Sequence, residues 1–219
     1  MPFPLRRAAA WTLTAGAFVA DWVAVATQDR RLELAAKPAA MPALALASVE
    51  AGLLDRPWGS QVLAGQAFGL GGDVFLLRDD KRSFLAGLSS FLVGHVGYIE
   101  AFRRMGLRRT SWVLPGVAAL GWCIWWSRDA LPNLWREGGA AAAGPVAAYM
   151  GVIGAMSLAA WSTGNPVTGT GASLFVISDT VIAVNAFVEP LDDAGLKVMV
   201  PYLLGQALIA AGALTHPAS

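Results

Sequence analysis

The sequence predicts an all-α membrane protein in which about eight transmembrane helices form a single domain over residues 1–219. Hydrophobic residues make up 56% of the 219 residues and charged residues only 14%, whereas a soluble domain carries about 25% charged residues. Apolar segments of about 17 to 20 residues recur, which is the length a helix needs to cross a ~30 Å hydrocarbon core. The segments between them are short and leave no room for a soluble domain.

Charged residues and glycine- or proline-containing breaks give the boundaries of the first four helices. The first helix is expected to be retained, because Asp21 interrupts the apolar run that a signal peptide needs. The second begins beside Lys37, the third is rich in small residues that let helices pack closely, and the fourth lies between two arginine-containing segments. These helices are predicted at residues 8–27, 38–54, 60–77 and 83–102.

The last four helices follow from the same criteria. The fifth begins after the arginines of segment 103–109, the seventh follows the polar segment 162–168, and the others are apolar runs of about 20 residues. A short similarity between Gly71–Phe75 and Ile177–Val181, four helices apart, suggests two parallel four-helix repeats. The four helices are predicted at residues 110–126, 140–161, 169–187 and 197–214.

Charge and composition exclude several classes of function. A net charge of +1 provides no basic face for nucleic acid, so the expected surroundings are membrane lipids. Cys123 is the only cysteine and cannot form a disulfide within the chain. With only His95 and His216, one chain cannot build a three-histidine zinc site, and neither a metal nor another cofactor is expected.

Two aspartates, Asp73 and Asp179, fall deep inside predicted helices. An ionisable group at membrane depth costs at least ~2.5 kcal/mol on insertion scales, so a functional role is the default hypothesis. The helices that carry them are four apart and therefore run in the same direction. Counted from the same face of the membrane, the two residues lie at depths that differ by no more than ~5 Å. If their helices are adjacent, the two carboxyl groups would lie close together. Asp21, by contrast, is interpreted as structural or interfacial.

Other polar residues share helical faces inside the predicted spans. His95 lies on a stripe with Phe91, Tyr98 and Phe102, and Gln206 lies one turn after Tyr202. A membrane histidine or asparagine often makes only an interhelical hydrogen bond worth ~0.6 kcal/mol, and a lysine near a helix end often snorkels to the interface. The candidate substrate-binding residues are Lys37, His95, Tyr98, Asn185, Tyr202 and Gln206.

An ordered set of motifs over residues 37–187 resembles the lysoplasmalogenase (YhhN-like) family. Each motif alone is weak, but their order is specific. They are Lys37-Pro38 with Pro42; Gly72-Asp73-Val74-Phe75-Leu76; Phe84-x-x-Gly87-Leu88-x-x-Phe91 with His95, Tyr98 and Phe102; and Phe175-x-x-Ser178-Asp179 with Asn185 and Phe187.

The resemblance implies eight transmembrane helices and hydrolysis of the vinyl ether bond of a lysolipid, giving a fatty aldehyde and a glycerophospho-base. Protonation of the enol ether carbon and addition of water require one carboxylic acid and one carboxylate, as in glycosidases. Asp73 and Asp179 are the expected catalytic residues, and Lys37 is expected to meet the lipid phosphate. The alanine-rich, arginine-biased composition favours a bacterial cell membrane as the location.

Two other functions use the same aspartates. A proton-coupled transporter of small solutes would use them as a proton relay and the suggested repeats as rocking halves. An intramembrane aspartyl protease is less favoured, because Leu70 occupies the first glycine position of its Gly-x-Gly-Asp signature and Pro42-Ala43-Leu44 lies in an early helix instead of the last.

Overall fold

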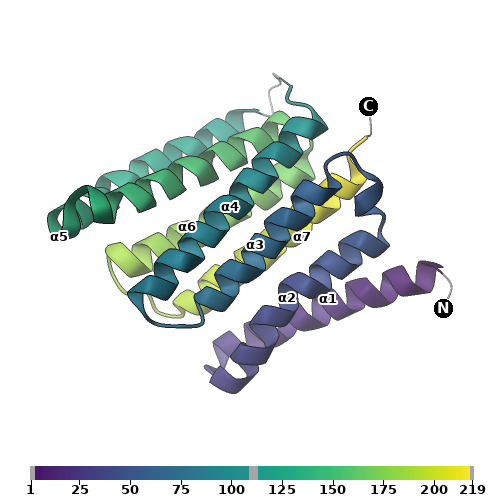
Figure 1. The fold of residues 1–219 in the computed structure, drawn as a ribbon, viewed down its shortest axis with the longest axis horizontal. Helices are drawn as coiled ribbons and strands as arrows, with labels where there is room; N and C mark the ends of the chain where they lie inside the picture. Colours follow the sequence, from purple (N-terminus) through teal and green to yellow (C-terminus); the bar gives the residue numbers. More distant parts are fainter. Residues whose placement is uncertain (1–2, 109–112, 218–219) are drawn as a thin grey trace. The chain divides into compact units, whose positions relative to one another are not determined.

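A computed structural model describes residues 3–108 and 113–217, and the regular secondary structure of these residues is helical throughout. The long helices run in the order in which the sequence predicts them (Figure 1). They are α1 (Phe3–Ala26), α2 (Arg30–Glu50), α3 (Gly59–Phe75), α4 (Lys81–Met105), α5 (Val113–Ser162), α6 (Pro166–Phe187) and α7 (Ala194–Thr215), with the short 3-10 helix η1 (Leu53–Asp55) between α2 and α3.

The helix α5 consists of two arms, and with them the described residues contain eight long helices, which is consistent with the prediction of about eight transmembrane helices. Gly138 and Gly139 depart from helical dihedral angles, and Gly139 has φ 58° and ψ −147°, which few residues other than glycine adopt. The arms fold back on each other, since a Cβ atom on Gly116 would lie 2.8 Å from Cα of Leu158 and one on Gly154 would lie 2.6 Å from the Leu120 side chain.

Six helical segments in the described residues are long and apolar enough to cross a membrane, which makes the chain a multi-pass membrane protein. They are most of α1, all of α2, α4, α6 and α7, and most of the second arm of α5, over Ala143–Ser162. Two long helical segments are not among these six, the first arm of α5 and α3, and α3 has 17 residues, which corresponds to ~26 Å of helix.

Contacts divide the chain into two compact units. The first comprises residues 1–105 with 210–219, and the second residues 106–209. In the first unit, α1 packs on α2, α2 on α3, and α3 on α4. In the second, α5 packs on α6, and α6 crosses α7 closely at Gly171 and Gly205, where a Cβ atom on either glycine would lie 2.7–2.8 Å from the carbonyl oxygen of the other.

The start of α2 corrects the sequence prediction. We expected the helix to begin at residue 38, with 28–37 as a connection, but it begins eight residues earlier. Asp29 caps it, because Oδ1 accepts hydrogen bonds from the backbone N–H groups of Arg31 (3.0 Å) and Leu32 (3.1 Å). Lys37 therefore lies two turns inside the helix, and Pro38 is accommodated within it.

Other boundaries differ by a few residues, and the largest difference is in α5. Its first arm continues to residue 137, beyond the predicted end at 126, because the helix accommodates Pro132 and its dihedral angles first become non-helical at the glycine pair. The first residues of that predicted helix, 110–112, lie outside the described residues.

Candidate functional site

Asp73 lies near the end of α3, two residues before the helix stops at Phe75. Its side chain is buried, with 4% of the residue exposed. The neighbouring Gly72 is covered by the Phe91 ring of α4, and a Cβ atom at Gly72 would lie only 2.4 Å from that ring. The glycine thus lets α4 approach α3 at the level of the carboxyl group.

The predicted aromatic stripe of α4 is confirmed as one buried face. Phe91, His95, Tyr98 and Phe102 are each at most 7% exposed. The rings of Tyr98 and Phe102 stack with centroids 6.2 Å apart, and Tyr98 lies over Gly65 of α3. The stripe therefore faces α3, the helix that carries Asp73, while substrate binding by His95 and Tyr98 stays a prediction.

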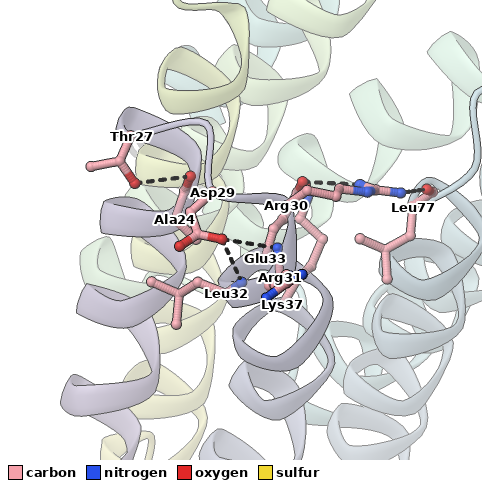
Figure 2. A network of polar contacts seen from close by, with 9 residues as sticks. All are labelled: Ala24, Thr27, Asp29, Arg30, Arg31, Leu32, Glu33, Lys37 and Leu77. Carbon is pink, nitrogen blue, oxygen red and sulfur yellow. Dashed lines mark hydrogen bonds and ion pairs between the residues drawn. The ribbon is translucent and has the colours of Figure 1, made fainter.

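Lys37 belongs to a polar network where α1 ends and α2 begins (Figure 2). Its Nζ lies 2.7 Å from Oε1 of Glu33, whose Oε2 lies 3.0 Å from Nη1 of Arg30. The Arg30 guanidinium also donates to the carbonyl oxygen of Leu77, just after α3. The network joins Lys37 to the end of α3 near Asp73, and the Lys37 side chain is only 12% exposed.

The start of α4, in the same unit, is capped by Asp80. Its Oδ1 accepts from the backbone N–H groups of Arg82 and Ser83, and its Oδ2 accepts from the Ser83 hydroxyl at 2.6 Å. These hydrogen bonds, above all that from the Ser83 side chain, lower the pKa of the Asp80 carboxyl group.

Asp179 lies in the second unit, on α6, and is partly buried. The buried phenol of Tyr149, from the second arm of α5, donates a hydrogen bond to its Oδ2. Tyr149 is not among the site residues predicted from the sequence, although a signal for it existed. The chain has only three tyrosines, all within predicted spans, and the other two, Tyr98 and Tyr202, were selected.

The remaining candidates of the second unit have different surroundings. Asn185 is exposed, and its Oδ1 accepts from the backbone N–H of Leu191 at 2.9 Å, which holds the turn after α6. Tyr202 is buried edge-on against Phe175, with ring centroids 5.1 Å apart. Gln206, one turn later on α7, is 0% exposed. The functional roles of these residues, and the pairing of the two aspartates, stay predictions.

Within the part of the chain that the structure describes, no three or more His, Cys, Asp or Glu side chains gather in a group that would hold a metal ion. Asp73, Asp179, Tyr149 and Lys37 offer two carboxyl groups, a phenol and an ammonium group.

Residues 32–213 match the YhhN family. The lysoplasmalogenase TMEM86A of Bos taurus is 32% identical over 174 residues, which cover 74% of this chain and 68% of the relative. The Homo sapiens protein of the same name is 30% identical over 175 residues with the same coverage, and the lysoplasmalogenase TMEM86B of Sus scrofa is 33% identical over 139 residues, 62% of this chain and 56% of the relative. No solved structure shows a significant match. The chain belongs to the YhhN family.

Proposed function

We propose that this protein is a membrane hydrolase that cleaves the vinyl ether bond of lysoplasmalogen-type lysolipids to a fatty aldehyde and a glycerophospho-base. The observation that carries the proposal is the similarity to proteins named lysoplasmalogenase over 74% of the chain. The family match includes both membrane aspartates, Asp73 and Asp179. A bacterial cell membrane is the proposed location.

The reaction requires a proton donor and a proton acceptor. A carboxylic acid protonates the vinyl carbon that is not bonded to oxygen, which leaves an oxocarbenium-like cation on the other carbon. Water adds to that carbon and gives a proton to a carboxylate. The resulting hemiacetal breaks its bond to the glycerol oxygen, so that one water molecule is consumed and an aldehyde and an alcohol are formed. General acid and base catalysis of such steps contributes about 10² to 10⁴-fold.

We assign the acid to Asp73 and the base to Asp179. The Tyr149 phenol donates a hydrogen bond to Oδ2 of Asp179. An ionised carboxyl group only accepts hydrogen bonds, so this contact suits the carboxylate form of Asp179. Asp73 is the more buried of the two, which keeps the group that delivers a proton to carbon away from water.

Six further residues would orient the substrate. Lys37, on α2 in the first unit, supplies a positive charge for the lipid phosphate. Its ammonium group acts as a point charge at the end of a flexible side chain. The others supply polar groups for the glycerol oxygens and the attacking water: His95, Tyr98, Asn185, Tyr202 and Gln206.

The decisive experiment uses purified protein in detergent, without an ion gradient, and a panel of vinyl ether, alkyl ether and acyl lysolipids. Aldehyde release from the vinyl ether lipid alone is the expected result. In D₂O with the aldehyde reduced as it forms, the resulting alcohol should carry one deuterium on the carbon next to the hydroxyl-bearing carbon. Cleavage of the acyl lipid alone would contradict the proposal, and gradient-dependent solute uptake without aldehyde would support a transporter instead.

A further inference from the structure

Three tryptophans on the first arm of α5 form an aromatic cluster in the second unit. The rings of Trp122, Trp125 and Trp126 contact one another pairwise, with centroids 5.4–5.8 Å apart. Their spacing of three and four residues places them on one side of the helix. Nε1 of Trp122 donates a hydrogen bond to Oγ1 of Thr180 on α6 at 3.1 Å. Since Thr180 directly follows Asp179, the cluster packs on α6 at the level of the proposed base.

The cluster extends from this level towards the end of α6. The second arm of α5 runs antiparallel to α6, because its residue Tyr149 contacts Asp179 and its later residue Trp161 donates to an earlier part of α6. The first arm folds back on the second and therefore runs parallel to α6. Trp126 lies one turn, ~6 Å, beyond the ring that contacts α6. It is thus on the side of Asp179 that is nearer to the headgroup layer.

The indole N–H of Trp126 is a buried donor. Its nitrogen is covered by protein atoms, and it has no hydrogen-bond acceptor among the described residues. The Thr180 hydroxyl is already engaged, since it accepts from Trp122 and donates to the carbonyl oxygen of Val176 at 2.8 Å. An unpaired donor within the hydrocarbon region is costly, because no bulk water is present to accept from it. An oxygen of a bound ligand would remove this cost.

A lipid can reach this donor from the bilayer. Trp122 is 44% exposed and Trp125 is 50% exposed, so two of the three rings lie at the surface of the helix pair. Exposed side chains change rotamer within nanoseconds. A small rotation of Trp125, which packs edge-on against Trp126, would open the Trp126 nitrogen to a lipid from the adjacent leaflet.

The position of the donor indicates which lipid oxygen it meets. In a lysolipid whose vinyl ether bond lies at Asp179, the next oxygens towards the headgroup layer are the glycerol 2-hydroxyl and then the phosphate. The charge of the phosphate favours the interface, whereas the neutral hydroxyl can lie deeper. An indole N–H is a neutral donor, and the hydroxyl oxygen has lone pairs that accept from it.

We infer that Trp126 binds the glycerol 2-hydroxyl oxygen of a lysolipid that reaches Asp179 from the bilayer. Trp126 is thus a further substrate-binding residue. Trp122 is a positioning residue, because its hydrogen bond to Thr180 fixes the cluster on α6. The inference rests on the proposed function for the choice of a lysolipid as the ligand.

The test measures binding of lysolipids that lack the vinyl group, so that it does not depend on catalysis. Two 1-alkyl ether lysolipids with the same chain and headgroup are compared, one with the glycerol 2-hydroxyl and one with hydrogen in its place. Each competes with a fluorescent lysolipid for the full-length protein in nanodiscs. The first variant is Trp126→Phe, and in a second protein 3-benzothienylalanine replaces Trp126, which exchanges the N–H for sulfur and keeps the ring shape. The matched control is Trp135→Phe, at a 61% exposed position on the same arm.

The wild-type protein should bind the hydroxyl lipid about three- to tenfold more tightly than the deoxy lipid, as expected for one neutral hydrogen bond. Both changes at Trp126 should weaken binding of the hydroxyl lipid to the level of the deoxy lipid and leave the affinity for the deoxy lipid nearly unchanged in the sulfur-containing protein. Trp135→Phe should preserve the wild-type ratio.

Equal affinity of the wild-type protein for the two lipids would overturn the inference. Equal weakening for both lipids in the sulfur-containing protein would overturn it too, because Trp126 would then only support the packing. These outcomes are separate from failure of the proposed function. A protein that hydrolyses the vinyl ether lipid and binds both alkyl lipids equally refutes only the inference, whereas binding that depends on the hydroxyl group and on Trp126, without hydrolysis, refutes only the proposed reaction.

Discussion

The phenol of Tyr149 donates a hydrogen bond to Oδ2 of Asp179 and so links the second arm of α5 to α6. If Asp179 is the base, this bond orients its carboxylate. Tyr149→Phe removes only the hydroxyl group, and we expect kcat to fall about 10- to 100-fold with little change in KM, because a lost hydrogen bond to a charged group is worth about 1.5–3 kcal/mol. Steady-state aldehyde release measures both constants.

The control for this prediction is the same substitution in an Asp179→Asn background. There the phenol has no carboxylate to orient, so Tyr149→Phe should add almost no further loss. An equal loss in both backgrounds would show that Tyr149 acts independently of Asp179.

Asp73→Asn and Asp179→Asn should each lower hydrolysis by at least about 10²-fold and leave a folded protein in the membrane, because asparagine keeps the size but cannot cycle a proton. The double variant should be scarcely worse than either single one, since residues that act as a unit show non-additive losses.

Rescue by a small anion separates the two roles. Azide or formate should restore part of the activity of Asp179→Asn, where the missing step is addition of water, and none of that of Asp73→Asn. Near-normal aldehyde release from either single variant would refute the paired-carboxylate mechanism. Rescue of the opposite variant would reverse the assignment of acid and base.

Lys37→Ala should mainly raise KM, because the proposed contact with phosphate contributes to binding of the ground state and the transition state alike. Lys37→Arg, which keeps the charge, should retain more of the affinity. The control is Lys81→Ala, at an exposed position at the start of α4. A large fall in kcat with unchanged KM would mean that Lys37 stabilises the transition state specifically.

Gly72→Ala should lower the stability of the first unit by about 1–3 kcal/mol, because the added methyl group would overlap the Phe91 ring. Activity should fall with it, since Asp73 is the next residue. Gly16→Ala on α1 is the control, as no atom lies within 4 Å of the new Cβ atom. Thermal unfolding of both variants measures the difference, and adding Phe91→Leu to Gly72→Ala should restore part of the stability if overlap with the ring is the cause.

The eight long helices predict that both termini lie on the same side of the membrane. Paired reporter fusions at the two ends measure this directly, with a fusion in the connection between α4 and α5 as an internal reference on the same side. Termini on opposite sides would mean that one of the eight segments does not span the membrane, and would remove the reason for expecting Asp73 and Asp179 at similar depth.

The sequence by itself determined the class of the protein and the number of its long helices. Apolar length and charged breaks depend only on local composition, and the bilayer requires a similar length of every span, so the order of the long helices was predictable from the sequence. The stripe with His95 and Tyr98 was predictable for the same reason, because helical periodicity places those residues on one face. The ordered motifs around Asp73 and Asp179 likewise identified the family, which the match over residues 32–213 confirmed.

Only the tertiary structure decided which side chains meet across helices. The hydrogen bond between Tyr149 and Asp179 joins residues 30 positions apart, and Arg30, which pairs with Glu33 on α2, also donates to the carbonyl oxygen of Leu77 just after α3. Such contacts depend on how helices are rotated and packed, which periodicity does not specify. The start of α2 was also missed. A proline beside a lysine suggested a boundary, but Asp29 caps the helix two turns earlier, and Pro38 lies within it.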